Sequence, residues 1–150
     1  LERGVAEVLA VDVGYGVLAW KIRNDPRVHV YERMNLRHAT PADLVFAPDL
    51  VVADLSFISL TMVLGTLVAV ATDDADLVLL VKPQFEVGRQ EASRGRGVIT
   101  DARLHRESVD KVVDAATRLG WEFRGSVESP IKGQDGNTEF LLHLTRAARA

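Results

Sequence analysis

The sequence contains no cysteine, which excludes disulfide bonds, thiolate metal sites and cysteine nucleophiles. A chain without cysteine fits a reducing compartment, and we expect a cytoplasmic protein. No apolar run approaches the roughly 18–20 residues that a membrane-spanning helix needs. The chain also lacks a basic stretch followed by an apolar one, the pattern of a signal peptide. We therefore expect no membrane partner.

A strong net charge is missing as well. The 150 residues carry a formal net charge of −3, so no positive field over the whole molecule indicates nucleic-acid binding. The segment from Lys82 to Arg106 differs, because it holds six Lys or Arg residues against three acids. This local excess predicts an anionic partner at one face, and arginines that serve only solubility are the alternative. The 47% hydrophobic and 26% charged residues are typical of a single globular domain.

Two short apolar segments, each ending in one charge, are the most informative part of the chain. Residues 77–81 read Leu-Val-Leu-Leu-Val and are followed by Lys82 and Pro83. Such a run is too short for a helix and is typical of a strand buried on both faces. Residues 49–54 have the same design and end in Asp54. Because ligands bind beyond the carboxyl ends of the strands in open α/β sheets, Asp54 and Lys82 are the first candidates for a site.

The rest of the pattern alternates strands with helices. We expect strands at residues 8–13, 28–31, 49–54, 77–82, 121–127 and 138–144, and helices at 15–23, 59–71 and 101–119, with another helix starting at 40–43. Residues 86–100 contain three glycines and are expected to form a long lid or substrate loop. The alternation predicts an α/β fold whose mostly parallel sheet is covered by helices on both faces, with an antiparallel edge at its C-terminal end.

Two more acids belong to predicted strand ends. Asp12 lies where an α/β nucleotide-binding unit often carries an acid that accepts hydrogen bonds from ribose hydroxyls, although a turn or helix cap is an equally good explanation. Glu139 lies near the start of the last strand. If it converges with Asp54 and Lys82, the lysine can orient a hydroxyl or accept its proton. A structural ion pair at the sheet edge is the alternative. The four histidines are scattered, so no metal site is expected.

Several unbroken motifs now carry a family resemblance. They are residues 11–20 (Val-Asp-Val-Gly-Tyr-Gly-Val-Leu-Ala-Trp), 24–28 (Asn-Asp-Pro-Arg-Val), 49–60, 81–88 (Val-Lys-Pro-Gln-Phe-Glu-Val-Gly), 97–98, 129–130 and 136–140 (Gly-Asn-Thr-Glu-Phe). Together they resemble the TlyA or hemolysin A family, whose members contain an FtsJ-like RNA ribose methyltransferase domain. The likeness extends over nearly the whole chain.

The resemblance implies a Rossmann-like class I methyltransferase sheet, S-adenosyl-L-methionine as methyl donor, and the ribose 2′-hydroxyl of ribosomal RNA as acceptor. It implies catalytic roles for Asp54, Lys82 and Glu139, the same three residues that their positions at strand ends select. The residues that it implies at the donor are Asp12, Val13, Asn35 and Asp54. Ribosomal subunits or their RNA are the expected partners. In the basic segment, Arg89, Arg94 and Arg96 are expected to bind RNA phosphates.

Some parts of the family pattern have no counterpart in the chain. The glycine-rich donor loop on the family's first strand, the first lysine of its Lys-Asp-Lys-Glu set and the small preceding RNA-binding domain are absent. The missing strand would lie beside those ending in Asp12 and Asp54, so its loss would expose two strand edges. We therefore expect residues 1–150 to be one FtsJ-like domain without its N-terminal strand, a fragment that is inactive alone.

Three other functions stay open. A membrane-active hemolysin is suggested by the family name, but the sequence has no amphipathic or spanning segment for it. A nucleotide-cofactor oxidoreductase uses a similar sheet, but an Asp-Lys-Glu set has no obvious role in hydride transfer. A non-catalytic RNA-binding or scaffold fragment is the third.

Overall fold

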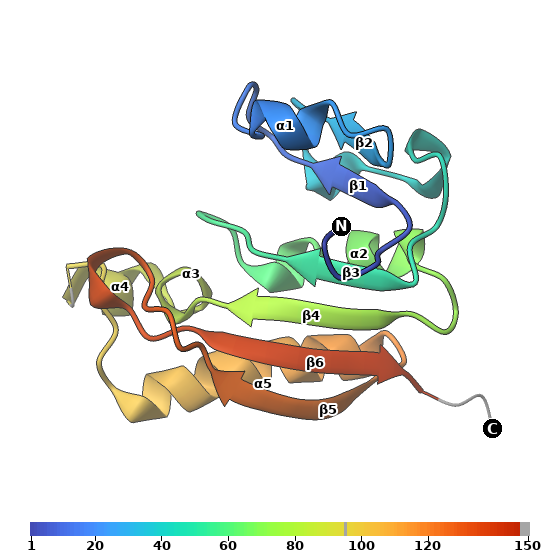
Figure 1. Cartoon of the computed structure of the whole chain (residues 1–150). Coiled ribbons are helices and arrows are strands. Elements are labelled where there is room, and N and C mark those ends of the chain that lie inside the picture. Colours follow the sequence, from blue (N-terminus) through green and yellow to red (C-terminus); the bar gives the residue numbers. More distant parts are fainter. Residues whose placement is uncertain (95, 148–150) are drawn as a thin grey trace.

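A computed structural model describes residues 1–94 and 96–147, without the side chains of Arg89, Arg94 and Gln134. Its strands form two separate sheets (Figure 1). The strands are β1 (Val8–Val11), β2 (Val28–Tyr31), β3 (Leu50–Ala53), β4 (Asp76–Val81), β5 (Trp121–Glu128) and β6 (Phe140–Arg146). One sheet pairs β1 with β2 in parallel, and the other has the order β3-β4-β6-β5. In the second sheet β3 and β4 are parallel, while β6 is antiparallel to both β4 and β5. The expected α/β class and antiparallel C-terminal edge are confirmed.

Short helices connect these strands. They are α1 (Trp20–Arg23), α2 (Leu64–Val70), α3 (Pro83–Glu86), α4 (Arg89–Arg94) and α5 (Ala102–Arg118), with 3-10 turns at Leu36–His38, Pro41–Asp43, Leu60–Met62 and Gln134–Gly136. Helix α5 matches its prediction, because the Asp101 carboxylate accepts a hydrogen bond from the Arg103 amide at 2.7 Å and Gly120 ends the helix at a φ of 80°. Among the described residues, no helix is long and apolar enough to cross a membrane.

The core lies on one face of the four-stranded sheet. Leu77, Leu79 and Val81 of β4 are fully buried, and they belong to the same cluster as Leu64 of α2 and Val112 of α5. Both helices therefore cover the same face (Figure 1). The opposite face is open at β3, where the side chains of Leu50 and Val52 are 48% and 70% exposed. The expectation that helices cover both faces is wrong for the described part of the chain.

Three local predictions also need correction. The helix expected at 15–23 begins only at Trp20, because Gly16 takes a φ of 72° that an α-helix does not allow. The start signal at 40–43 produces a single 3-10 turn, in which Thr40 donates two hydrogen bonds to Asp43 and thereby lowers the pKa of that carboxyl. The segment 86–100 is not a plain loop, since it contains α4.

Candidate functional site

The carboxyl ends of β3 and β4 bring two opposite charges together. Asp54 directly follows β3, and Lys82 directly follows β4, its parallel neighbour. The Lys82 Nζ lies 2.7 Å from the Asp54 Oδ1. The lysine side chain is only 13% exposed, whereas that of the aspartate is 67% exposed. The ammonium is thus partly shielded by protein, while its counter-ion faces solvent and is accessible to a substrate.

The ammonium of Lys82 is held from a second side. Its Nζ donates a hydrogen bond to Ser56 Oγ at 3.3 Å, so Asp54 and Ser56 both approach it from the loop after β3. Pro83 begins α3 directly behind the lysine and keeps its backbone extended. An ammonium has three N–H donors. Within the described part of the chain two of them have partners, which leaves one for the oxygen of a substrate.

Glu139 lies beside this pair but contacts it indirectly. Val81 pairs with Phe140 in the sheet, so Lys82 and Glu139 each stand one residue beyond that pair. Glu139 is 5% exposed, and its Oε1 accepts a hydrogen bond from Gln84 Nε2 at 2.9 Å. Among the described ion pairs, none joins Lys82 to Glu139 directly. The predicted triad is therefore an ion pair and a neighbouring buried carboxylate that are connected through the Lys82–Gln84 turn.

The loop that follows β5 closes over Glu139. A Cβ atom added to Gly133 would lie 2.1 Å from Glu139 Oε1, so any larger residue here would force the glutamate side chain to move. Asn137, two residues before the glutamate, accepts a hydrogen bond from the Ile99 amide at 3.0 Å and donates one to the Gly97 carbonyl at 2.8 Å. Asn137 thereby ties residues 97–99 of the basic segment to the site.

A buried acid that the sequence analysis missed fixes the loop after β3. Glu86 of α3 is 5% exposed, and its carboxylate accepts hydrogen bonds from Ser59 Oγ at 2.5 Å and from the Leu60 amide at 2.7 Å. Lys111 of α5 completes the cluster with an Nζ–Oε2 distance of 3.2 Å. Glu86 follows Lys82 by four residues, so this cluster connects the loop after β3 to the turn after β4.

A second residue that sequence reasoning missed is Phe57. Its side chain is 86% exposed and its φ is 62°, a left-handed conformation that is unfavourable for an aromatic residue. Its ring lies 5.2 Å from the ring of Phe85, centroid to centroid. Phe57 belongs to the same loop as Asp54 and Ser56. The sequence alone has no signal for it, because an apolar residue after a strand is ordinarily buried.

The predicted donor-side residues gather at the carboxyl ends of β1 and β2. Asp12 follows β1, and its Oδ1 accepts a hydrogen bond from the Gly14 amide at 2.6 Å. The Met34 amide donates to the Asp12 carbonyl at 3.1 Å, which brings the loop with Asn35 beside it. Asn35 Oδ1 accepts a hydrogen bond from the Arg37 amide at 3.0 Å, and the side chain of Val13 is 71% exposed.

The arginine predictions are only partly within the described residues. Arg89 and Arg94 lie at the two ends of α4, and their side chains are outside the described part. Arg96 is exposed and has a φ of 51°. No group of three or more His, Cys, Asp or Glu residues with metal-site geometry occurs among the described residues.

Comparison with known proteins decides the classification. The family of FtsJ-like methyltransferases matches residues 1–146. The chain belongs to this family. The FtsJ-like chain is 54% identical to a Mycobacterium tuberculosis protein named 16S/23S rRNA (cytidine-2'-O)-methyltransferase TlyA. The alignment has 151 residues and covers 100% of this chain and 56% of the relative. It is 34% identical to Hemolysin A of Brachyspira hyodysenteriae, over 96% of this chain and 60% of that protein. The FtsJ-like chain thus spans little more than half the length of these curated relatives.

Solved structures agree with this classification. A crystal structure of a hemolysin candidate from Lactococcus lactis has a TM-score of 0.92 at 43% identity, covering 96% of the FtsJ-like chain and 69% of that chain. A methyltransferase candidate from Listeria monocytogenes, named as S-adenosylmethionine dependent, has a TM-score of 0.63 at 16% identity. The match covers 98% of the FtsJ-like chain and 83% of the Listeria chain. At this identity, the likeness to the Listeria protein shows only that the two chains share a fold. The resemblance and the fold class inferred from the motifs are confirmed.

Proposed function

We propose that the protein transfers a methyl group from S-adenosyl-L-methionine to the 2′-hydroxyl of a ribosomal RNA nucleotide. The observation that carries this proposal is the ion pair of Asp54 and Lys82 at the carboxyl edge of β3 and β4, with Glu139 buried beside it. The name of the M. tuberculosis relative, with 54% identity over the whole chain, supports the same reaction.

The residues at the ends of β1 and β2 fit an adenosine-containing donor. Asp12 uses one carboxylate oxygen for Gly14, and within the described chain its second oxygen has no partner, so it can accept a hydrogen bond from a ribose hydroxyl. Asn35 uses its oxygen for the Arg37 amide and keeps an NH₂ donor for a ring nitrogen. The exposed Val13 offers an apolar contact for the base. These residues would hold S-adenosyl-L-methionine, which would supply an electrophilic methyl group there.

The acceptor chemistry falls to Lys82 and its neighbours. A ribose hydroxyl is a weak nucleophile at neutral pH, so it must be aligned and relieved of its proton. The remaining N–H of Lys82 orients the hydroxyl oxygen, and the exposed Asp54 carboxylate borders the same space and can hold the proton that leaves. Glu139 is a positioning residue that acts through Gln84. DNA lacks the hydroxyl, so the reaction is specific for RNA.

The basic segment supports an RNA substrate. Arg89, Arg94 and Arg96 belong to a locally cationic stretch of a chain with a net charge of −3, and Asn137 ties this stretch to the site. We propose that these arginines bind RNA phosphates. Affinity for the substrate should therefore fall as the salt concentration rises, and charge-neutralising substitutions should flatten that dependence.

The decisive experiment measures methyl incorporation into purified ribosomal subunits by the full-length protein, with nucleoside analysis of the product. Lys82→Ala should reduce turnover by at least roughly 100-fold, because the hydroxyl loses its alignment. Donor binding in calorimetry should be unchanged. Lys132→Ala is the matched control, since Lys132 is a half-exposed lysine paired with Glu128 near the same edge. A base-methylated product, or near-native turnover by Lys82→Ala, contradicts the proposal.

A further inference from the structure

The basic segment ends in a strap, residues 97–99, that is held from two sides. On one side Asn137 accepts a hydrogen bond from the Ile99 amide and donates one to the Gly97 carbonyl. On the other side the His105 ring donates from Nε2 to the Ile99 carbonyl at 2.7 Å. The side chain of Ile99 is itself buried. These contacts fix the strap in place against the start of α5 and the segment that leads into β6.

Helix α4 ends directly before the strap, and its end carries an unusual residue. The Arg96 amide donates to the Ser93 carbonyl at 3.1 Å. The Gly97 amide donates to the Ala92 carbonyl at 2.9 Å. This pair of bonds is the Schellman pattern, in which the first residue beyond the helix cap is left-handed and usually glycine. Here that residue is Arg96, with a φ of 51°, so an unfavourable backbone conformation holds an arginine where glycine would fit better.

The side chain of Arg96 is available for an anion. It is exposed, and in the described part of the chain its guanidinium has no acidic partner. Arg103, just beyond the strap, differs, because it forms ion pairs with Asp101 and Glu107. A guanidinium matches a phosphate group with two parallel N–H donors, which fixes the orientation of the bound group as well as its distance.

Asn137 also connects the strap to the proposed catalytic residues. Asn137 and Glu139 are 3% and 5% exposed and stand two positions apart, directly before β6. Glu139 in turn accepts a hydrogen bond from Gln84, two residues after Lys82. Figure 1 shows α4 at the same end of the sheet as the start of β6. The position of Arg96 is thus linked to that of Lys82 through a few covalent and hydrogen-bonded steps.

We propose that Asn137 is a positioning residue for the acceptor RNA: it fixes the strap and thereby holds Arg96 against a phosphate of the target strand near the reacting ribose. The inference rests on the proposed methyl transfer to RNA and names the arginine of the basic segment that aligns the substrate. The unfavourable conformation of Arg96 is then explained, because it directs the guanidinium at the strand.

Arg96→Gly in the full-length protein separates recognition from folding. Glycine is preferred at a left-handed helix end, so the Tm should stay the same or rise. The lost phosphate contact should raise the KM for purified ribosomal subunits by roughly 10- to 100-fold. Arg118→Ala is the control and should change the KM little, because Arg118 is an exposed cation at the far end of α5, about 25 Å along the helix from the strap. An unchanged KM in Arg96→Gly overturns the proposal.

The salt dependence of binding to ribosomal subunits tests Asn137 itself. Each phosphate contact contributes about 0.7 to 0.9 to the slope of log Kd against log salt concentration. Arg96→Gly should lower the slope by this amount, and Asn137→Ala should lower it equally although it removes no charge. The double variant should be no worse than either single one, because both substitutions remove the same contact.

A milder variant keeps this test valid if Asn137→Ala does not fold. Asn137→Asp retains the acceptor for the Ile99 amide but loses the donor to the Gly97 carbonyl, so it should also lower the slope. A native slope in a folded Asn137 variant, or effects of Asn137→Ala and Arg96→Gly that simply add, means that Asn137 only stabilises the fold. Either result overturns the proposal.

Binding requires no methyl transfer, so the slopes are also measured in the Lys82→Ala background. The expected slope changes together with a base-methylated product would refute the proposed reaction and leave Arg96 as an RNA contact. Ribose methylation by the native protein with an unchanged slope in Arg96→Gly refutes the role of Arg96 and Asn137 alone.

Discussion

At the scale of single residues, Phe57 is the clearest sign of function. A bulky side chain at positive φ costs on the order of 1–3 kcal/mol and persists only where the surroundings impose it. Here the strained backbone presents an aromatic ring that is 86% exposed, in the loop that also carries Asp54 and Ser56. Aromatic rings on RNA-binding surfaces stack on bases. We expect Phe57 to stack on a base of the acceptor RNA.

Phe57→Ala in the full-length protein should therefore weaken RNA substrate binding by about 5- to 100-fold, because one base–ring contact is lost. The free energy of unfolding should stay nearly the same, since the ring is exposed. Steady-state kinetics on ribosomal subunits and urea unfolding measure the two effects. Phe57→Tyr should retain binding, and Phe123→Ala on β5, 46% exposed, is the matched control. Unchanged KM in Phe57→Ala removes the residue from substrate recognition.

Gly133 provides a steric prediction at the same scale. A methyl group at this position collides with Glu139 and forces it away from Gln84. Gly133→Ala should therefore lower kcat of the full-length enzyme by roughly 10- to 100-fold, since small displacements at a site have large effects on rate. Gly125→Ala, where the added Cβ meets nothing within 4 Å, should leave kcat unchanged. A native kcat in Gly133→Ala shows that the position of Glu139 is unimportant.

At the scale of elements, the cluster around Glu86 connects three segments of the chain. This α3 carboxylate accepts hydrogen bonds from Ser59 Oγ and the Leu60 amide, at the start of the 3-10 turn Leu60–Met62. Lys111 of α5 forms an ion pair with the same carboxylate. A buried carboxylate with this many donors stabilises the fold only while all partners are present. The arrangement holds the loop with Asp54 against the turn with Lys82.

Glu86→Ala should lower the free energy of unfolding by about 3 kcal/mol, because Ser59 and the Leu60 amide lose a charged acceptor. Glu107→Ala on α5 is the control: this exposed residue pairs with Arg103 at 2.7 Å, and its loss should cost at most about 0.5 kcal/mol. Urea unfolding followed by circular dichroism compares the two variants. A similar small loss in both variants means that the Glu86 cluster contributes little.

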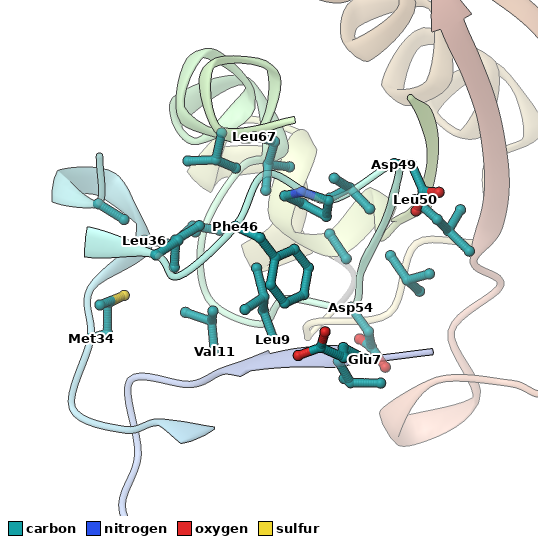
Figure 2. A pocket seen from close by; sticks show the side chains of 18 of the residues that line it. Glu7, Leu9, Val11, Met34, Leu36, Phe46, Asp49, Leu50, Asp54 and Leu67 are labelled. Carbon is teal, nitrogen blue, oxygen red and sulfur yellow. The ribbon is translucent and has the colours of Figure 1, made fainter. Parts of the chain in front are cut away.

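At the scale of the whole molecule, stability is unevenly distributed. Of the described residues, those in the core cluster come from the four-stranded sheet, the helices that cover it and the turns between them, and none comes from β1 or β2. Leu9 and Val11 of the two-stranded unit line a pocket between the two sheets (Figure 2). Elements with little buried apolar contact open at a lower free energy than the core.

In the 150-residue chain by itself, amides of β1 and β2 should consequently exchange faster than those of β4 and β6, through an opening that leaves the four-stranded sheet intact. Native-state hydrogen exchange in increasing urea separates this partial opening from global unfolding. Exchange of all four strands with one common free energy shows instead that the two sheets unfold as one unit.

The sequence by itself determined the features that depend on neighbouring residues. Apolar runs predicted the strands, the Asp101 cap and Gly120 bounded α5, and two charges at the ends of successive strands predicted the meeting of Asp54 and Lys82, because parallel neighbours end at one edge. The motifs also led to the correct family. Apolar runs, helix caps and motifs depend on residues that are close together in the sequence. They can therefore be recognised without knowing how distant segments pack.

The tertiary structure decided which side chains meet across distant segments and which are left open. The contact of Glu139 with Gln84, 55 positions apart, and the burial of Glu86 follow from packing that no local pattern encodes. The exposure of Phe57 and the pocket between β1 and β3 likewise depend on how whole elements are arranged. Burial is a property of the assembled sheet, because each face and edge is defined by what packs against it.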